Sequence, residues 1–227
     1  MKLLALDTAT EALSVSLLVG ERCIDRYVEI ERGHAEQLLP MIESVLAEAG
    51  LALGSLDALA FGRGPGGFTG VRLAASVAQG LAFGAGLGVV PISDLAAVAW
   101  RVARIEPGVQ RVLVANDARM REVYWAEFES APPLLSMLGT EQVGPSSAVL
   151  PLAVAGQRWA AAGRGLRAWP ELAERCRAAG AAVHPDLLPR ASEILELARP
   201  LVSAGQILDP AQALPVYVRD RVAEPAL

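Results

Sequence analysis

The stretch from 62 to 70, GRGPGGFTG, holds five glycines and one proline in nine positions. Backbone with so few side chains can closely approach another backbone or a ligand. The residues before it, DALAFG, predict a strand, and residues 71–83 predict a helix. A glycine-rich joint between a strand and a helix is typical of an α/β fold, and it raises the question of whether the joint binds a phosphate.

Neither of the two common nucleotide motifs is complete. The spacing of Gly62, Gly64 and Gly67 matches the dinucleotide fingerprint, but that site also needs an acid about 20 residues on, at the end of the next strand. The nearest acid, Asp94, lies at the start of a helix, where an N-cap is the simpler interpretation. The lysine of a P-loop is missing. We therefore interpret these residues as a structural loop that allows close packing on a neighbouring strand: Gly64, Pro65, Gly66, Gly67, Phe68, Thr69 and Gly70.

The first half of the chain alternates strands and helices in a recognisable order. Hydrophobic periodicity predicts strands at 3–7, 13–20 and 22–30, a helix at 34–50, a strand at 57–62, a helix at 71–83, a strand at 88–93 and a helix at 94–106. This is the order of a ribonuclease-H-like lobe.

The second half partly repeats that order. It predicts strands at 111–117, 122–129 and 152–156, a loop with a short strand at 131–151, and a helix from Ser192, its N-cap, to 205. We therefore expect an α/β protein of two ribonuclease-H-like lobes, at 1–105 and 106–227. The last segment of the second lobe can return to the first.

Composition limits the possible functions. The chain has 227 residues, 53% of them hydrophobic, and a net charge of −5, which argues against a surface that binds nucleic acid alone. Cys23 and Cys176 lie far apart, so neither a disulfide framework nor a thiolate zinc site is expected. The opening residues do not resemble a signal peptide, and 74–90 predicts a buried helix and strand, not a membrane span. We expect a cytoplasmic protein without a membrane partner.

The helix at 71–83 has an unusual distribution of polar residues. Arg72, Ser76 and Gln79 form one narrow polar stripe, and nearly all other positions are apolar or small. A surface helix of a monomer usually shows a broad polar face. We therefore expect burial on two sides, one against the sheet and the other against a partner helix or another part of the same chain.

Candidate chemistry is sparse. Asp7, Thr8 and Thr10 end the first predicted strand, where proteins of the actin, sugar-kinase and Hsp70 class face a nucleotide phosphate and its metal, although the same residues are common in turns. We interpret them as a vestigial nucleotide site. His34 starts a helix, but Leu38 stands where a second metal ligand would lie one turn later. The chain also lacks a G-x-S-x-G nucleophile elbow, so we predict no catalytic residue and no metal site.

Five stretches together resemble the TsaB (YeaZ) family, bacterial proteins of the tRNA threonylcarbamoyladenosine pathway. They are LLALDTAT, RGHAEQLLPMIESVL, AFGRGPGGFTGVRLAASVAQGLA, NDARMREVYWAEF and LPVYVRDRVA. The resemblance runs almost from end to end. It departs at Gly67, where the family more often has serine, and between 131 and 152, which follows no family pattern.

The resemblance implies the two-lobed fold of the actin/Hsp70/sugar-kinase (ASKHA) superfamily and a non-catalytic role beside TsaD, a related transferase. With the ATPase TsaE, these proteins transfer the threonylcarbamoyl group from threonylcarbamoyl-adenylate to N6 of adenosine 37 in tRNAs that read codons beginning with A. TsaD holds its metal through a histidine pair on the helix that corresponds to the one starting at His34. The resemblance thus assigns ATP, ADP and metal to the partner subunits, and tRNA contact to the complex.

In the family, the first two helices bundle with those of TsaD, or of a second TsaB when TsaD is absent. The candidate contacts are Leu38, Leu39, Ile42, Val45, Leu46, Val71, Ala74, Ala75, Ala78 and Ala82, some of which must face their own sheet. The alternative is an enzyme. A phosphotransferase would need Asp7, Thr8 and Thr10 to hold Mg-ATP, and a peptidase would need a metal or a nucleophile.

Overall fold

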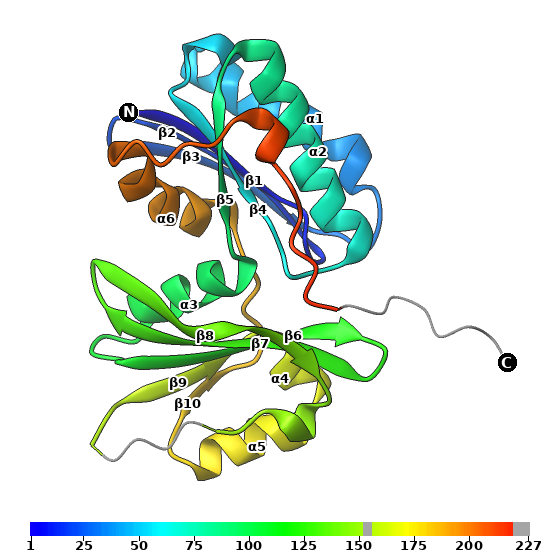
Figure 1. The fold of residues 1–227 in the computed structure, drawn as a ribbon, viewed down its shortest axis with the longest axis vertical. Coiled ribbons are helices and arrows are strands. Elements are labelled where there is room, and N and C mark those ends of the chain that lie inside the picture. Colours follow the sequence, from blue (N-terminus) through cyan, green and yellow to red (C-terminus); the bar gives the residue numbers. More distant parts are fainter. Residues whose placement is uncertain (152–155, 220–227) are drawn as a thin grey trace, which may run out of the picture.

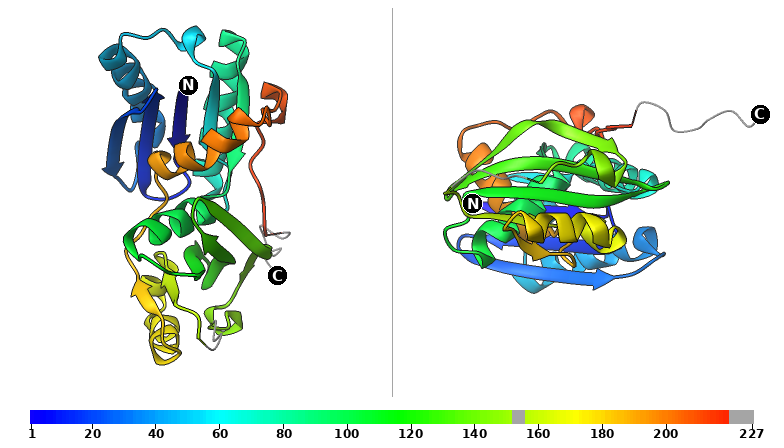
Figure 2. Two further views of the ribbon diagram at one scale, coloured as in Figure 1. Left: turned by 90° about the vertical axis from the view of Figure 1, so that its left-hand side faces the viewer. Right: turned by 90° about the horizontal axis from the view of Figure 1, so that it is seen from below.

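Two five-stranded sheets, one in each lobe, form the centre of the molecule (Figures 1 and 2). The computed structural model describes residues 1–151 and 156–219. The elements up to the predicted boundary are β1 (Lys2–Asp7), β2 (Ala12–Val19), β3 (Arg22–Glu29), α1 (His34–Ala49), β4 (Ala58–Gly62), α2 (Phe68–Ala85), β5 (Gly88–Ile92) and α3 (Asp94–Ile105). Those after it are β6 (Arg111–Arg119), β7 (Glu122–Ala131), β8 (Leu134–Gly144), β9 (Trp159–Ala162), α4 (Gly165–Ala168), α5 (Pro170–Ala178), β10 (Ala182–His184) and α6 (Ala191–Ser203).

The two sheets have the same strand order. The first is β3-β2-β1-β4-β5 and the second is β8-β7-β6-β9-β10, and in each the first three strands form antiparallel hairpins while the last two run parallel to the central strand. The central strands are apolar along almost their whole length because helices cover both faces of each sheet. The predicted recurrence of one lobe pattern is therefore present.

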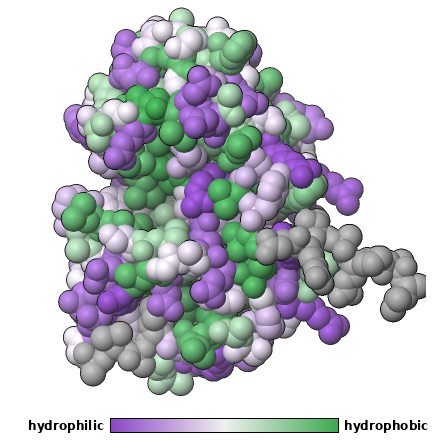
Figure 3. Space-filling model, viewed as in Figure 1, coloured by the Kyte–Doolittle hydropathy of each residue, from purple (hydrophilic) through white to green (hydrophobic). Residues whose placement is uncertain are grey.

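The lobes exchange helices across the predicted boundary. Leu95, Val98 and Val102 of α3, which precedes the boundary, pack on the second sheet. In return, Ile194 and Leu195 of α6 pack on the first sheet, on the face opposite α1 and α2. In Figure 1 the two helices lie between the sheets, and Figure 3 shows the surface hollowed at the waist between the lobes.

Local structure departs from expectation at β8 and at the start of α6. The stretch 131–151, predicted as mainly loop, contains β8, an eleven-residue strand paired with β7. A register shift between Trp125 and Glu127 and a left-handed Gly139 (φ 79°) interrupt the alternation that would have indicated a strand. The N-cap of α6 is Arg190, not Ser192, and the Ser14 hydroxyl of β2 accepts a hydrogen bond from Ala191 N (2.9 Å). The strand expected at 152–156 falls largely outside the described residues.

In the described part of the chain, none of the helices combines the length and the apolar character that crossing a bilayer requires.

Candidate functional site

The glycine loop packs directly on the turn between β1 and β2. Gly67 N donates to Ala9 O (2.7 Å). A β-carbon on Gly66 would lie 2.5 Å from the same oxygen, and one on Gly70 would overlap the carbonyl oxygen of Thr8. These glycines are thus required because two backbones touch.

The same loop is fastened to the second lobe by Arg63. Its guanidinium donates to both carboxylate oxygens of Glu141 on β8 (2.9 and 3.3 Å), and the Ser93 hydroxyl donates to Glu141 as well (2.5 Å). The Glu141 side chain is only 7% exposed, so water screens this pair weakly. Val216 N, near the C-terminus, donates to Arg63 O (2.7 Å). We call this group of contacts around residues 62–67 the interlobe joint.

We expect Glu141→Ala to lower the free energy of unfolding by about 2 kcal/mol, because it leaves the Arg63 guanidinium and the Ser93 hydroxyl without their acceptor. Urea unfolding measures the effect. The double variant Arg63→Met/Glu141→Leu is expected to recover part of the loss, because it removes the charges together. Equal losses in the single and double variants would contradict this account of the joint.

Asp7 and Asp94 lie side by side at the joint, and neither has exposed surface. The expected N-cap role of Asp94 is wrong, because Ser93 caps α3 by accepting from Ala96 N (3.1 Å). Asp94 Oδ2 instead accepts from Gly64 N (2.5 Å). Burial raises the pKa of Asp7, and burial together with the Asp7 carboxylate raises the pKa of Asp94 well above its ordinary value.

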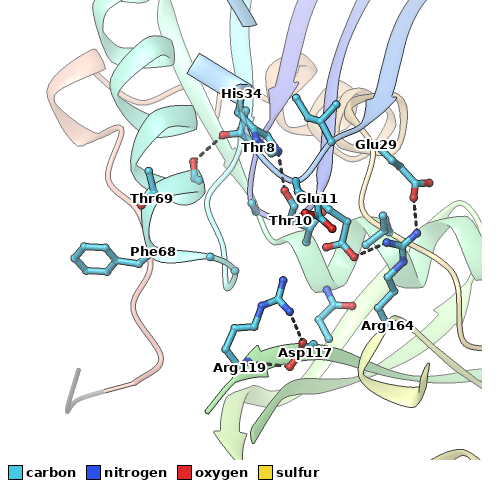
Figure 4. A pocket seen from close by; sticks show the side chains of 18 of the residues that line it. Thr8, Thr10, Glu11, Glu29, His34, Phe68, Thr69, Asp117, Arg119 and Arg164 are labelled. Carbon is cyan, nitrogen blue, oxygen red and sulfur yellow. Dashed lines mark hydrogen bonds and ion pairs between the residues drawn. The ribbon is translucent and has the colours of Figure 1, made fainter. Parts of the chain in front are cut away.

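The hydroxyls predicted as a vestigial nucleotide site take part in the fold (Figure 4). Thr8 donates to the carbonyl of Gly70 (2.6 Å), and Thr10 Oγ1 accepts from Ala12 N (3.1 Å). His34 Nε2 donates to the carbonyl of Thr10 (3.0 Å), which ties the start of α1 to the same turn. With Asp7 buried against Asp94, these residues do not fit a magnesium-bound phosphate.

A cleft of about 1210 Å³ lies between the lobes, on the open side of this turn. Arg164, from the loop before α4, crosses it to form ion pairs with Glu11 and Glu29 of the first lobe (Figure 4). The amide of Asn116, at the end of β6, also lines the cleft, and it has no hydrogen-bond partner among the described residues. Across the described ranges, no three or more His, Cys, Asp or Glu side chains are grouped so that they could hold a metal ion.

The structure sorts the ten candidate contacts of α1 and α2. Eight of them are at most 3% exposed: Leu38, Ile42, Val45, Val71, Ala74, Ala75, Ala78 and Ala82. All of these except Val71 belong to the core cluster that α1 and α2 form with the first sheet, and none of the eight offers side-chain surface to a partner. Leu39 is 46% exposed, and Leu46 is partly buried. Leu39 is thus the exposed member of the ten, and the partner interface itself stays a prediction.

The outer side of α2 is open. Phe83 is 81% exposed, and a β-carbon on Gly80 or Gly84 would meet nothing within 4 Å. Ser76, Gly80, Phe83 and Gly84 lie along one exposed stripe of α2, which we call the α2 outer face. Its small residues permit another helix to approach closely, and Phe83 provides an apolar anchor.

At its first turn, α2 carries an exposed aromatic cluster. The Arg72 guanidinium carbon lies 3.4 Å from the ring centroid of Phe68 and 5.3 Å from that of Tyr217. Arg72 Nε also donates to the Tyr217 hydroxyl (2.6 Å). The sequence indicated none of this, because Tyr217 is 145 residues from Arg72 along the chain. The C-terminal segment therefore borders the α2 outer face.

Comparison with known proteins gives consistent matches. Residues 28–224 match the family model described as TsaD, tRNA N6-adenosine threonylcarbamoyltransferase. The tRNA threonylcarbamoyladenosine biosynthesis protein TsaB of Escherichia coli strain K12 is 38% identical over 98% of this chain and 96% of its own length.

Solved structures agree. A Pseudomonas aeruginosa protein, described as uncharacterized with similarity to peptidase YeaZ, superposes with a TM-score of 0.88 at 46% identity, over 96% of this chain and 99% of that one. The activator of the 2-hydroxyisocaproyl-CoA dehydratase of Clostridium difficile superposes with a TM-score of 0.50 at 12% identity, over 91% and 97%, which shows a shared fold alone. The predicted α/β fold of two lobes is confirmed.

Proposed function

Because this chain belongs to the TsaB (YeaZ) family, we propose that it acts in threonylcarbamoyladenosine formation on tRNA as the non-catalytic partner of the transferase TsaD. The transferred group passes from threonylcarbamoyl-adenylate to N6 of adenosine 37. TsaE is the third member of the complex, and tRNA is bound by the complex, not by this chain alone. In the absence of TsaD, two copies of this chain pair through the same surface.

The observation that carries the proposal is the α2 outer face. It combines the exposed Phe83 with Gly80 and Gly84, where a partner helix can approach the backbone. Leu39 of α1 adds a second exposed apolar side chain on the neighbouring helix. Burying apolar area of usual interface size at such a surface supports stable association.

The site chemistry supports a subunit more than an enzyme. Asp7, Thr8 and Thr10, which a phosphotransferase would need for Mg-ATP, are committed to contacts that hold the β1–β2 turn against α2 and α3. Leu38, where TsaD has the second histidine of its metal pair, is fully buried in the core of the first lobe. The proposal therefore assigns metal and nucleotide to the partner subunits.

Reconstitution tests the function. Purified TsaD, TsaE, tRNA and threonylcarbamoyl-adenylate are incubated with this chain omitted and then restored, and modified adenosine is measured by mass spectrometry of the digested tRNA. We expect modification only when the chain is present, and none from the chain by itself. Turnover by this chain in the absence of TsaD would overturn the proposal.

A further inference from the structure

Two carboxyl groups meet where the first sheet joins α3. Asp7 ends β1 and Asp94 begins α3, and neither is exposed to solvent. A β-carbon at position 62 would overlap Oδ1 of Asp7 and Oδ1 of Asp94, so only glycine fits there. Because α3 packs on the second sheet, this pair connects elements of the two lobes.

Each carboxyl has one oxygen with a backbone donor and one without. Ala9 N donates to Asp7 Oδ1 (2.9 Å), and Gly64 N donates to Asp94 Oδ2 (2.5 Å). Asp7 Oδ2 and Asp94 Oδ1 are buried and receive no hydrogen bond from any described residue. Two ionised groups would leave both oxygens unsatisfied and would place like charges together in a medium of low dielectric constant. One proton removes both penalties, because a protonated carboxyl can donate to its ionised neighbour.

We propose that Asp7 and Asp94 hold one shared proton at neutral pH, and that the resulting hydrogen bond fastens the interlobe joint. Asp94 carries the proton, and its second oxygen continues to accept from Gly64 N in the glycine loop.

The charges that face the pair are few. His34 of α1 favours the ionised form of Asp7, and Arg63 of the glycine loop favours the ionised form of Asp94. Arg63 is itself paired with Glu141, which offsets its charge. Burial is the largest influence on the pKa of both acids and raises it, and Asp7 raises the pKa of Asp94 further.

The sign of the pH dependence follows. A carboxyl whose pKa is higher in the folded than in the unfolded protein binds its proton more tightly when folded. The stabilisation that this proton provides is therefore present in full below pH 3.8, which corresponds to the ordinary pKa of Asp. It is lost as the pH rises through the raised pKa of the folded pair. At high pH the joint contains two adjacent negative charges and loosens.

Asp94→Asn is the informative variant, because an amide at this position can donate to Asp7 permanently while its oxygen still accepts from Gly64 N. Urea unfolding of the full chain is followed from about pH 5 to about pH 9. We expect the unfolding midpoint of Asp94→Asn to rise relative to that of the unmodified chain as the pH increases. The infrared carbonyl band of a protonated carboxylic acid is expected in the unmodified chain at neutral pH and absent from the variant.

Matched variants keep the test decisive. Asp186→Asn, at an exposed surface pair, is expected to leave the pH profile unchanged. Asp7→Asn is expected to show the same pH dependence of the unfolding midpoint as Asp94→Asn. If Asp94→Asn does not fold, the Asp7→Asn profile and the infrared band of the unmodified chain test the proposal instead. Parallel pH profiles for the Asp94→Asn variant and the unmodified chain would overturn the proposal. So would a midpoint raised by Mg²⁺ in the unmodified chain and not in Asp94→Asn, because the pair would then be a cation site.

Discussion

Gly70→Ala is expected to lower the free energy of unfolding by about 3 kcal/mol, while Gly80→Ala in the same helix is expected to raise it by about 0.5–1 kcal/mol. A β-carbon at position 70 would overlap the carbonyl oxygen of Thr8, which cannot move without disturbing the β1–β2 turn. At position 80 the space is open, so the substitution only removes the entropic cost of a glycine within a helix. The same chemical change thus has opposite effects ten residues apart in α2.

Urea unfolding at low protein concentration measures both values, because association between copies then adds little to the apparent stability. A third variant, Gly84→Ala, also lies in open space and serves as the matched control for Gly80→Ala. If Gly70→Ala were as stable as the unmodified chain, close backbone packing would not explain the glycines of the loop.

Phe83→Glu and Gly80→Glu are expected to weaken TsaD binding by about 100-fold each, with the fold intact. The first places a charge where an exposed aromatic ring would be buried, and the second fills the space that a partner helix needs. Binding is measured by titration calorimetry with purified TsaD, and folding by circular dichroism and urea unfolding of the same samples. Because neither position touches the core of the first lobe, the two readouts are separable.

Two further substitutions show which positions can serve as a control and which cannot probe the interface. Ala178→Glu, on the exposed side of α5 in the second lobe, is expected to leave TsaD binding unchanged. Ala78→Glu is unsuitable as an interface probe, because Ala78 is fully buried and a charge there would unfold the lobe. Unchanged TsaD affinity in both Phe83→Glu and Gly80→Glu would move the interface away from α2.

The sequence predicts the fold well where its patterns are local. The helix at 34–50 ends at Gly50, which adopts the expected left-handed conformation, and the strand–glycine–helix order around 62–70 is present. Prediction failed for β8, where a bulge and a left-handed glycine hide the alternation. The short α4 and α5 were not predicted, because they contain few residues of a repeating apolar pattern.

The candidate site was less accessible to prediction, because it depends on contacts between distant residues. The apolar periodicity of α1 and α2 predicted both helices but could not distinguish the side facing the sheet from the side facing outward. Asp7 and Asp94 are 87 positions apart, and only the parallel neighbours β1, β4 and β5 bring them together. The partner of Arg63 lies on β8, the strand that prediction missed.

The exchange of α3 and α6 has a consequence for how the chain is made. During synthesis, β1 to β5 emerge from the ribosome first, but the face of their sheet that α6 covers stays bare until residues 191–203 have followed. The amino-terminal lobe therefore cannot complete its core while translation is under way, unlike a domain that finishes before the next begins. A chain cut between the end of α3 and the start of α6 would leave an apolar sheet face open to aggregation.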